Sequence, residues 1–243
     1  MREKFYVTTP IYYINAVPHI GHAYSTIAAD VLARWHRLRE EDVFFLTGLD
    51  ENSAKTVEAA KEKGYEEIQE YADDMAKKWR EVWNVLDISY NDFIRTTQER
   101  HKKNVHKFFN ELKENDEVYK GTYEGLYCEG CEGYLTEKDL VDGKCPLHQE
   151  EPQKLKEENY FFKLSKYQDQ LLEHIKNNPE FIQPETRRNE VISLLEDGLE
   201  DVSISRPHLE WGIGVPGDEE QTFWVWFDAL INYILPQDYW PAD

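Results

Sequence analysis

Two histidines and a glycine at the start of a predicted helix are the first residues whose types and spacing suggest chemistry. His19 and His22 are three residues apart, so their rings leave the first helical turn on the same side. Gly21 between them carries no side chain, which lets a flat group approach the backbone. Imidazoles, an open backbone and the positive end of a helix dipole together favour a polyphosphate. The spacing also fits a pair that only caps the helix, or half of a metal site, and the residues alone leave these alternatives open.

A second cluster, Cys128-x2-Cys131-x13-Cys145-x2-His148, contains every cysteine of the chain. Three cysteines cannot all pair as disulfides, and two close pairs of ligands have the spacing of a tetrahedral structural zinc knuckle. The alternative is three free thiols and an unrelated histidine. Four protein ligands leave no open position on the metal, so we expect the zinc to be structural. Tight turns in the knuckle are favoured by three glycines: Gly130, Gly133 and Gly143.

The elements that must position the histidines alternate between strand and helix. Residues 5–9 read as a strand, and a helix follows, with an apolar stripe of Ile20, Ile27, Val31, Trp35 and Leu38. A second strand over 42–47 precedes Asp50. This alternation predicts an α/β fold with a Rossmann-like, doubly wound parallel sheet. Ligands bind beyond the carboxyl ends of strands in such sheets, so we expect the histidines and Asp50 to line one crevice.

The remaining pattern predicts three parts. Residues 1–116 form the first half of the Rossmann-like domain, with helices over 52–63, 66–86 and 98–115 and a strand over 93–95. Residues 117–222 form an insertion that holds the zinc knuckle at about 122–150, a strand over 159–164 and helices over 165–177 and 187–197. Residues 223–243 return to the first domain as a strand passing into a helix, and we expect the catalytic domain to be incomplete at its C-terminus.

Composition narrows the classes of function. The formal net charge of −20 disfavours a surface built to grip nucleic acid, and the basic clusters at 77–80, 100–103 and 187–188 read as ordinary solvated helix faces. No window approaches the roughly 18 uninterrupted apolar residues of a membrane-spanning helix. The N-terminus enters a strand without the apolar run of a secretory signal. We therefore expect a cytoplasmic protein with no membrane partner.

Five segments stand out together, in this order: Thr8-Thr9-Pro10-Ile11-Tyr12-Tyr13-Ile14-Asn15-Ala16-Val17-Pro18-His19-Ile20-Gly21-His22-Ala23-Tyr24, Thr47-Gly48-Leu49-Asp50-Glu51, the cysteine cluster, Ser203-Ile204-Ser205-Arg206-Pro207 and Val225-Trp226-Phe227-Asp228-Ala229-Leu230. These segments resemble the motifs of methionyl-tRNA synthetases, a class I aminoacyl-tRNA synthetase family. The resemblance covers essentially the whole chain.

The resemblance implies an enzyme that joins methionine to ATP and then passes the methionyl group to tRNA(Met). It implies that His19 and His22 are catalytic, that they bind ATP with Gly21, and that Mg²⁺ accompanies the nucleotide. It also implies a methionine pocket in which the Asp50 carboxylate binds the substrate ammonium and aromatic side chains contact the thioether. The pocket residues are Ile11, Tyr13, Asp50, Trp226, Ala229 and Tyr233. Without the resemblance, the aromatic groups read more simply as core.

The chain departs from the family pattern in two places. Asn52-Ser53 stands where the family usually has His-Gly, which puts any role of position 52 in doubt. The second, lysine-rich signature of class I synthetases is not found; Lys163-Leu164-Ser165-Lys166 matches it superficially but lacks the glycine-rich flanks of a mobile lid. We therefore expect a fragment, a split-gene product that needs a separate C-terminal synthetase chain, or a remnant.

Two alternatives stay open beside the leading interpretation. One is a class I synthetase for another amino acid: leucine, valine, isoleucine or cysteine. The other is a catalytically inactive, zinc-containing module that still binds methionine or nucleotide. The aromatic pocket residues and the single Cys3His knuckle argue against the first, and the missing second signature favours the second.

Overall fold

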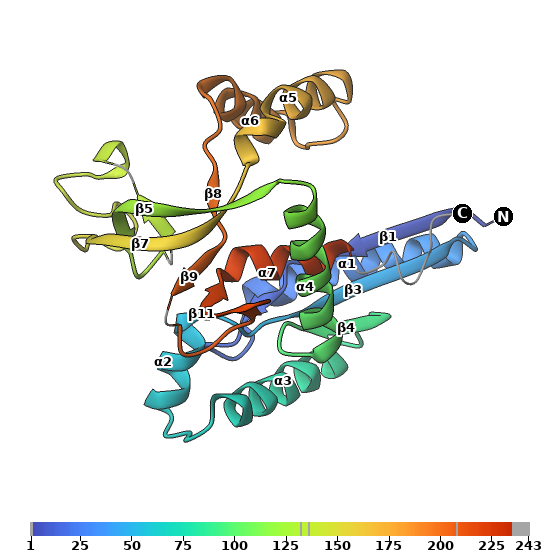
Figure 1. Cartoon of the computed structure of the whole chain (residues 1–243). Coiled ribbons are helices and arrows are strands. Elements are labelled where there is room, and N and C mark those ends of the chain that lie inside the picture. Colours follow the sequence, from blue (N-terminus) through green and yellow to red (C-terminus); the bar gives the residue numbers. More distant parts are fainter. Residues whose placement is uncertain (1, 132, 136, 208, 235–243) are drawn as a thin grey trace. The chain divides into compact units, whose positions relative to one another are not determined.

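The structure, a computed structural model, describes residues 2–131, 133–135, 137–207 and 209–234. The chain forms two compact units (Figure 1): residues 1–108 with 208–243 make the first, and residues 109–207 make the second. Helix α4 (Glu99–Glu114) runs through the boundary between them. The division proposed from the sequence places the insertion at 117–222 instead, and it stays a proposal.

The first unit is built on a parallel sheet, as predicted. Strand β3 is its centre: Leu49 pairs with Tyr12 on one edge and with Arg95 on the other. The first strand pairs in parallel with the beginning of β3, so two consecutive short strands share one edge. The strands are β1 (Lys4–Thr8), β2 (Tyr12–Tyr13), β3 (Asp42–Asp50) and β4 (Asp92–Arg95).

Helices cover both faces of this sheet. Val43, Phe45 and Leu49 point to one face, where they pack with α1 (Ile20–Leu38), α2 (Ala54–Glu62) and α3 (Ile68–Val85). On the other face, Phe44 and Leu46 pack with Ile94, Tyr6 and Ile11, and both Tyr6 and Ile11 bond to Tyr233, which follows α7 (Val225–Ile231). Helix α4 packs on α7 through Phe108 and Phe227. The doubly wound arrangement is therefore confirmed.

The apolar stripe predicted for α1 is not its buried face. Ile20, Trp35 and Leu38 are 89, 50 and 84% exposed, and Ile27 and Val31 are also exposed. The buried face consists of small or polar residues, namely Thr26, Ala29, Asp30 and Ala33. Small side chains let the helix axis approach the sheet closely, whereas periodicity alone does not say which side of a helix faces the core.

Gly48 in the central strand marks a close approach of backbones. A Cβ placed there would lie 2.2 Å from the carbonyl oxygen of Ile94 on β4. Gly48→Ala is therefore expected to lower the free energy of unfolding by about 1–3 kcal/mol, because the neighbouring strand must move. Urea denaturation measures this. Gly214→Ala is the control, since its Cβ would meet nothing closer than 4.0 Å; equal effects of the two substitutions would contradict the prediction.

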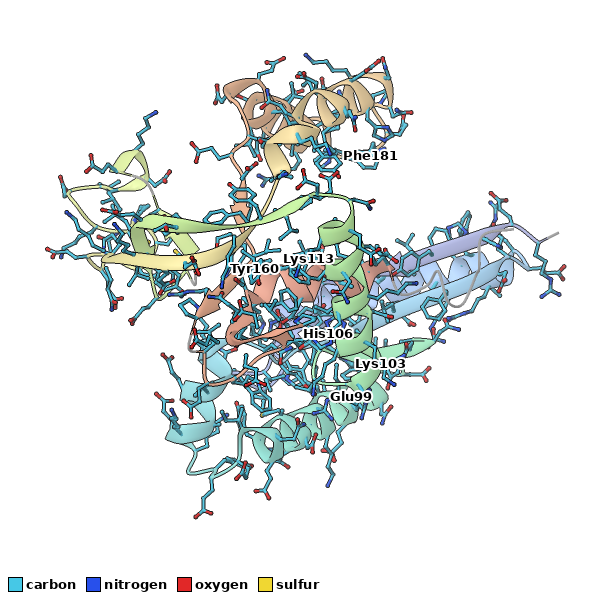
Figure 2. The ribbon with its side chains drawn as sticks, viewed as in Figure 1. Glu99, Lys103, His106, Lys113, Tyr160 and Phe181 are labelled. Atoms are coloured by element: carbon cyan, nitrogen blue, oxygen red, sulfur yellow. The ribbon has the colours of Figure 1, made fainter. Side chains whose placement is uncertain are left out.

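The second unit is organised by a long antiparallel pair of strands. β5 (Val118–Cys128) pairs with β7 (Gln153–Phe162) from one end to the other, and the predicted knuckle lies in the connection between them. Only the end of β7 was predicted from the sequence, as a strand over 159–164, and β5 was not predicted. Smaller elements complete the unit: β6 (Gly133–Leu135), η1 (Glu137–Asp139), α5 (Gln168–Asn177), α6 (Glu185–Asp197), β8 (Val202–Ser203) and β9 (Ser205–Pro207). In Figure 2, Tyr160 lies on β7, and its ring meets Phe109 edge to face.

The segment that superficially matches the second signature forms a short 3-10 helix, η2 (Leu164–Tyr167). Both of its lysines are held by acidic neighbours: Lys163 bonds to Asp116, and Lys166 bonds to Glu117. These contacts agree with the interpretation that the segment is structural.

Candidate active site and metal centre

Asp50 lies where the central strand ends. β3 is buried along nearly its whole length, and Asp50 itself is only 6% exposed. The parallel pairing places Tyr13 of β2 directly beside Asp50. The carboxylate is thus held at the carboxyl end of the sheet, where a parallel α/β fold binds its ligands.

The segment 226–233 carries the other predicted pocket residues. The backbone N–H of Ile11 donates to Tyr233 Oη at 3.3 Å, and Tyr6 Oη donates to the carbonyl oxygen of Tyr233 at 3.1 Å. Ala229 is buried, whereas Trp226 is 46% exposed and so presents much of its ring to solvent. These contacts bring the Ile11 strand edge and the end of α7 together.

Tyr233 and Asp50 are electrostatically coupled. Burial raises the pKa of Tyr233, and the negative charge of Asp50 acts in the same direction. The structure therefore gathers Asp50, Tyr13, Ile11 and Tyr233 at one end of the sheet. A buried carboxylate beside aromatic rings can take a primary ammonium and an apolar side chain.

His19 and His22 cap α1 reciprocally. The backbone N–H of Gly21 donates to His19 Nδ1 at 3.0 Å, and the backbone N–H of His19 donates to His22 Nδ1 at 3.2 Å. Because each Nδ1 accepts, each neutral ring carries its proton on Nε2. The two rings are stacked with centroids 3.7 Å apart. Burial is the larger cause that lowers the pKa of His22, and the neighbouring His19 is the smaller one. Capping thus fixes a tautomer that can donate to an anion.

Tyr12 and Trp79 support this turn, although neither was among the site residues predicted from the sequence. The buried ring of Tyr12 stacks on Trp79 and lies 4.8 Å from the His22 ring. Trp79 Nε1 donates to the carbonyl oxygen of Ala16, which anchors the segment leading to His19. The large aromatic side chain of Trp79 was a signal of burial, but its basic neighbours at 77–80 led to its interpretation as part of a solvated helix face.

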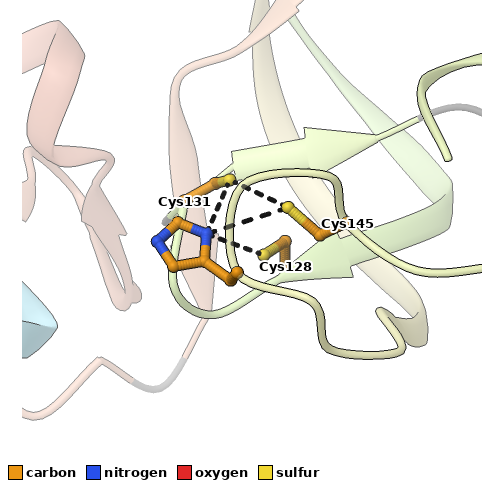
Figure 3. A group of neighbouring side chains, drawn as sticks. Cys128, Cys131 and Cys145 are labelled. Carbon is orange, nitrogen blue, oxygen red and sulfur yellow. Dashed lines mark hydrogen bonds between the residues drawn. The ribbon is translucent and has the colours of Figure 1, made fainter. Parts of the chain in front are cut away.

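The metal-ligand cluster is assembled in the second unit. One ligand atom from each of Cys128, Cys131, Cys145 and His148 lies within 4.8 Å of the others. The separations from His148 Nδ1 to the three sulfurs are 3.3, 3.7 and 3.8 Å, and the Cys131 and Cys145 sulfurs are 3.5 Å apart. Tetrahedral zinc, with bonds of about 2.0–2.3 Å, has edges of roughly this length. Figure 3 shows the three cysteine side chains directed toward a common centre. The residues fit the metal that the sequence predicted.

Two glycines shape the cluster for different reasons. Gly143 has φ of +76°, a left-handed conformation that glycine adopts readily. At Gly130, a Cβ would lie 2.4 Å from the His148 ring, so the requirement there is close approach and not φ. Gly133 lies in strand β6, away from the positive-φ positions of the described chain.

Buried polar residues flank Asp50 and were only partly foreseen. Glu51 is fully buried; Arg95 Nε donates to its Oε1 at 2.7 Å, and Trp211 Nε1 donates to its carbonyl oxygen. Asn52 is also buried. His101, expected on a solvated helix face, is 0% exposed, because α4 turns this side toward α7. In Figure 2, Glu99, Lys103 and His106 lie along the same helix.

Within the described ranges, none of the helices combines the length and apolar character needed to cross a membrane.

Comparison with known proteins gives one family for the whole chain. A family model described as tRNA synthetases class I (M) matches residues 5–155 and 137–242. The methionine–tRNA ligase of Streptomyces coelicolor is 48% identical over 98% of this chain, which spans 46% of that protein. The enzyme of Thermotoga maritima is 46% identical over 99% of this chain, which spans 40% of that protein. The chain thus covers less than half the length of these relatives.

Two solved structures that match this chain are of the same family. The methionyl-tRNA synthetase of Mycobacterium tuberculosis in complex with methionyl-adenylate matches 99% of this chain with a TM-score of 0.91 and 40% identity. The free form of that enzyme matches with a TM-score of 0.80 and 38% identity. This chain covers 50% and 49% of those two chains.

Proposed function

Because the chain belongs to the class I tRNA synthetases of the methionine type, we propose that it is the amino-terminal part of the catalytic region of a methionine–tRNA ligase. The reaction would activate methionine with ATP and transfer the methionyl group to tRNA(Met). The observation that carries the proposal is Asp50, buried at the carboxyl end of β3 beside Tyr13 and coupled to Tyr233.

Methionine recognition follows from this arrangement. Asp50 would accept hydrogen bonds from the substrate ammonium, an interaction strengthened by the partly desolvated site. Trp226 and Tyr233 would contact the thioether, since sulfur interacts favourably with aromatic rings. The proposed methionine pocket would also contain Ile11, Tyr13 and Ala229. The half-exposed Trp226 ring would close over the side chain.

ATP would bind at the start of α1. A carboxylate oxygen of methionine would form a bond to the α-phosphorus of ATP. The bond between that phosphorus and the oxygen that bridges to the β-phosphate would break, and pyrophosphate would leave with the electron pair. Nε2–H groups of His19 and His22 would donate to phosphate oxygens on which negative charge develops. The bare backbone at Gly21 would let the nucleotide approach. Mg²⁺ would accompany the phosphates and offset their charge.

Zinc would be held by Cys128, Cys131, Cys145 and His148 and would stabilise the connection between β5 and β7. Its four protein ligands leave no position for substrate, so its role is structural. The remaining partner in the proposal is a separate C-terminal synthetase chain that would supply the rest of the catalytic region. The proposed location is the cytoplasm, whose reducing conditions keep the cysteines available as metal ligands.

Methionine-dependent exchange of pyrophosphate into ATP tests the proposed function. With the downstream half of a related ligase supplied as a separate chain, we expect exchange with methionine and none with leucine or cysteine as controls, because the proposed pocket would suit a thioether. Isothermal titration of methionine, run in parallel, separates binding from chemistry. Exchange with another amino acid would contradict the assignment of the substrate.

The second candidate, a binding module without turnover, is favoured by the structural character of Lys163 and Lys166, whose ion pairs remove them from the role of a mobile lid. It predicts zinc and methionine binding with no pyrophosphate exchange. That result must persist when the downstream half of a related ligase is supplied as a separate chain.

A further inference from the structure

Asp228 is a carboxylate in an unusual place. It lies on α7 and is 0% exposed, between two polar side chains from distant parts of the first unit. Asn52 Nδ2 donates to Asp228 Oδ2 at 3.3 Å, and His101 Nε2 lies 3.6 Å from Asp228 Oδ1. Asn52 and His101 are buried as well. Three elements of the fold therefore meet at one buried polar contact.

Each of these residues is tied to the proposed methionine pocket. Asn52 follows Asp50 by two residues, and its amide also bonds to the carbonyl oxygen of Thr96 at 3.4 Å. Asp228 lies on the helix between Trp226 and Ala229. His101 extends from α4, which packs along α7. A shift of Asp228 would therefore move the aromatic wall of the pocket relative to Asp50.

Burial favours an uncharged contact. It raises the pKa of Asp228 well above its usual range, and it lowers the pKa of His101 to about 4. Both shifts disfavour charge in a dry environment. Asn52 Nδ2 donates to one oxygen of Asp228, and the other oxygen lies 3.6 Å from His101 Nε2, an uncharged polar neighbour that is not hydrogen-bonded to it. The three groups form a buried polar cluster that is held together by the bond between Asn52 and Asp228 and by the packing of α4 along α7.

We propose that Asn52, Asp228 and His101 form a buried polar cluster that fixes α7 against the end of β3, which makes Asp228 a positioning residue for methionine recognition. The inference rests on the proposed function. It also gives a role to the departure at Asn52-Ser53: the amide at position 52 supplies the donor that holds the carboxylate.

The test exchanges the amide at position 52 and the carboxyl group at position 228, first one at a time and then together. Asn52→Asp keeps the shape of the side chain but removes the donor and sets two acids against each other. We expect the dissociation constant for methionine, measured by titration calorimetry on the full chain, to rise at least about tenfold, because a buried acceptor loses its partner. The dissociation constant for ATP is expected to stay within about twofold. Asn84→Asp, on the exposed surface of α3, is the matched control and should change neither constant.

The double variant Asn52→Asp with Asp228→Asn restores an amide and an acid in exchanged positions. We expect it to recover methionine affinity to within about threefold of the parent. Unfolding in urea, followed for the parent, both single variants and the double variant, gives the coupling between the two positions. Unchanged methionine affinity in Asn52→Asp, equal losses for methionine and ATP, or a double variant no better than the singles would each overturn the proposed role of the cluster.

Failure of the proposed function gives a different pattern. In that case the parent itself binds no methionine. The cluster is then decided by the unfolding cycle: recovery of stability in the double variant supports the contact between positions 52 and 228, and additive losses overturn it.

Discussion

Removal of the metal from the cluster of Cys128, Cys131, Cys145 and His148 is expected to unfold the β5–β7 region while the first unit stays folded. Structural zinc sites in small peptides bind with about 10–16 kcal/mol of apparent free energy, which is as large as the stability of a whole domain. Among the described residues that connect these strands, only Cys145 is buried, and Cys128 is the last residue of β5. The stability of this connection therefore depends on the metal.

The measurement is amide hydrogen exchange on the full chain before and after chelation, with zinc content determined in parallel. Protection should be lost between residues 118 and 162 and kept in β3 and α3. His148→Ala should reproduce the loss, whereas His174→Ala, at an exposed histidine in the same unit, should bind one zinc per chain. Less than one zinc per chain after mild purification, with unchanged protection, would count against the structural role.

Replacement of His19 by alanine is expected to lower the rate of methionine-dependent pyrophosphate exchange, measured with the downstream half of a related ligase supplied as a separate chain, by about 10²–10³, the usual effect of removing one donor to developing charge. Methionine affinity should stay within about twofold, because Asp50 and Tyr233 lie on other elements. Exchange kinetics under saturating ATP, together with methionine titration, separate the two quantities. An equal loss in rate and in methionine affinity would contradict the ATP role of His19.

His19 also caps α1, so a control must separate capping from chemistry. His19→Asn keeps an oxygen that can accept from the N–H of Gly21, and asparagine is among the best N-cap residues. We expect this variant to retain the thermal stability of the parent and still to lose exchange. A His19→Asn variant with full activity would show that the imidazole is needed only as a cap.

The local elements of the first unit could be read from the sequence because their signals are local. α3 and α4 begin and end within two residues of the predicted helices, since their amphipathic period is set by neighbours a turn away. The long strand β5 was missed for a physical reason. Its burial alternates weakly between intermediate and exposed along most of its length, so it lacks the apolar alternation that marks a half-buried strand.

The α1 helix shows where periodicity misleads. Its apolar stripe of large side chains was read from the sequence, but the structure leaves that stripe exposed and buries Ala29 and Ala33 instead. A stripe of large side chains records only that one side of a helix is apolar. Which side meets the sheet depends on how closely the helix must approach it, and that distance is a property of the packed fold.

The metal-ligand set, the two histidines at the start of α1 and the family motifs could be read directly from the residues, because each lies in a short stretch whose spacing is fixed by the backbone. Only the tertiary structure brought Asp228 to Asn52, 176 positions away, and turned His101 inward toward both. Such contacts leave no periodic trace in a single sequence. They arise when helices on one face of a sheet pack together and exclude water, which makes isolated polar residues partners.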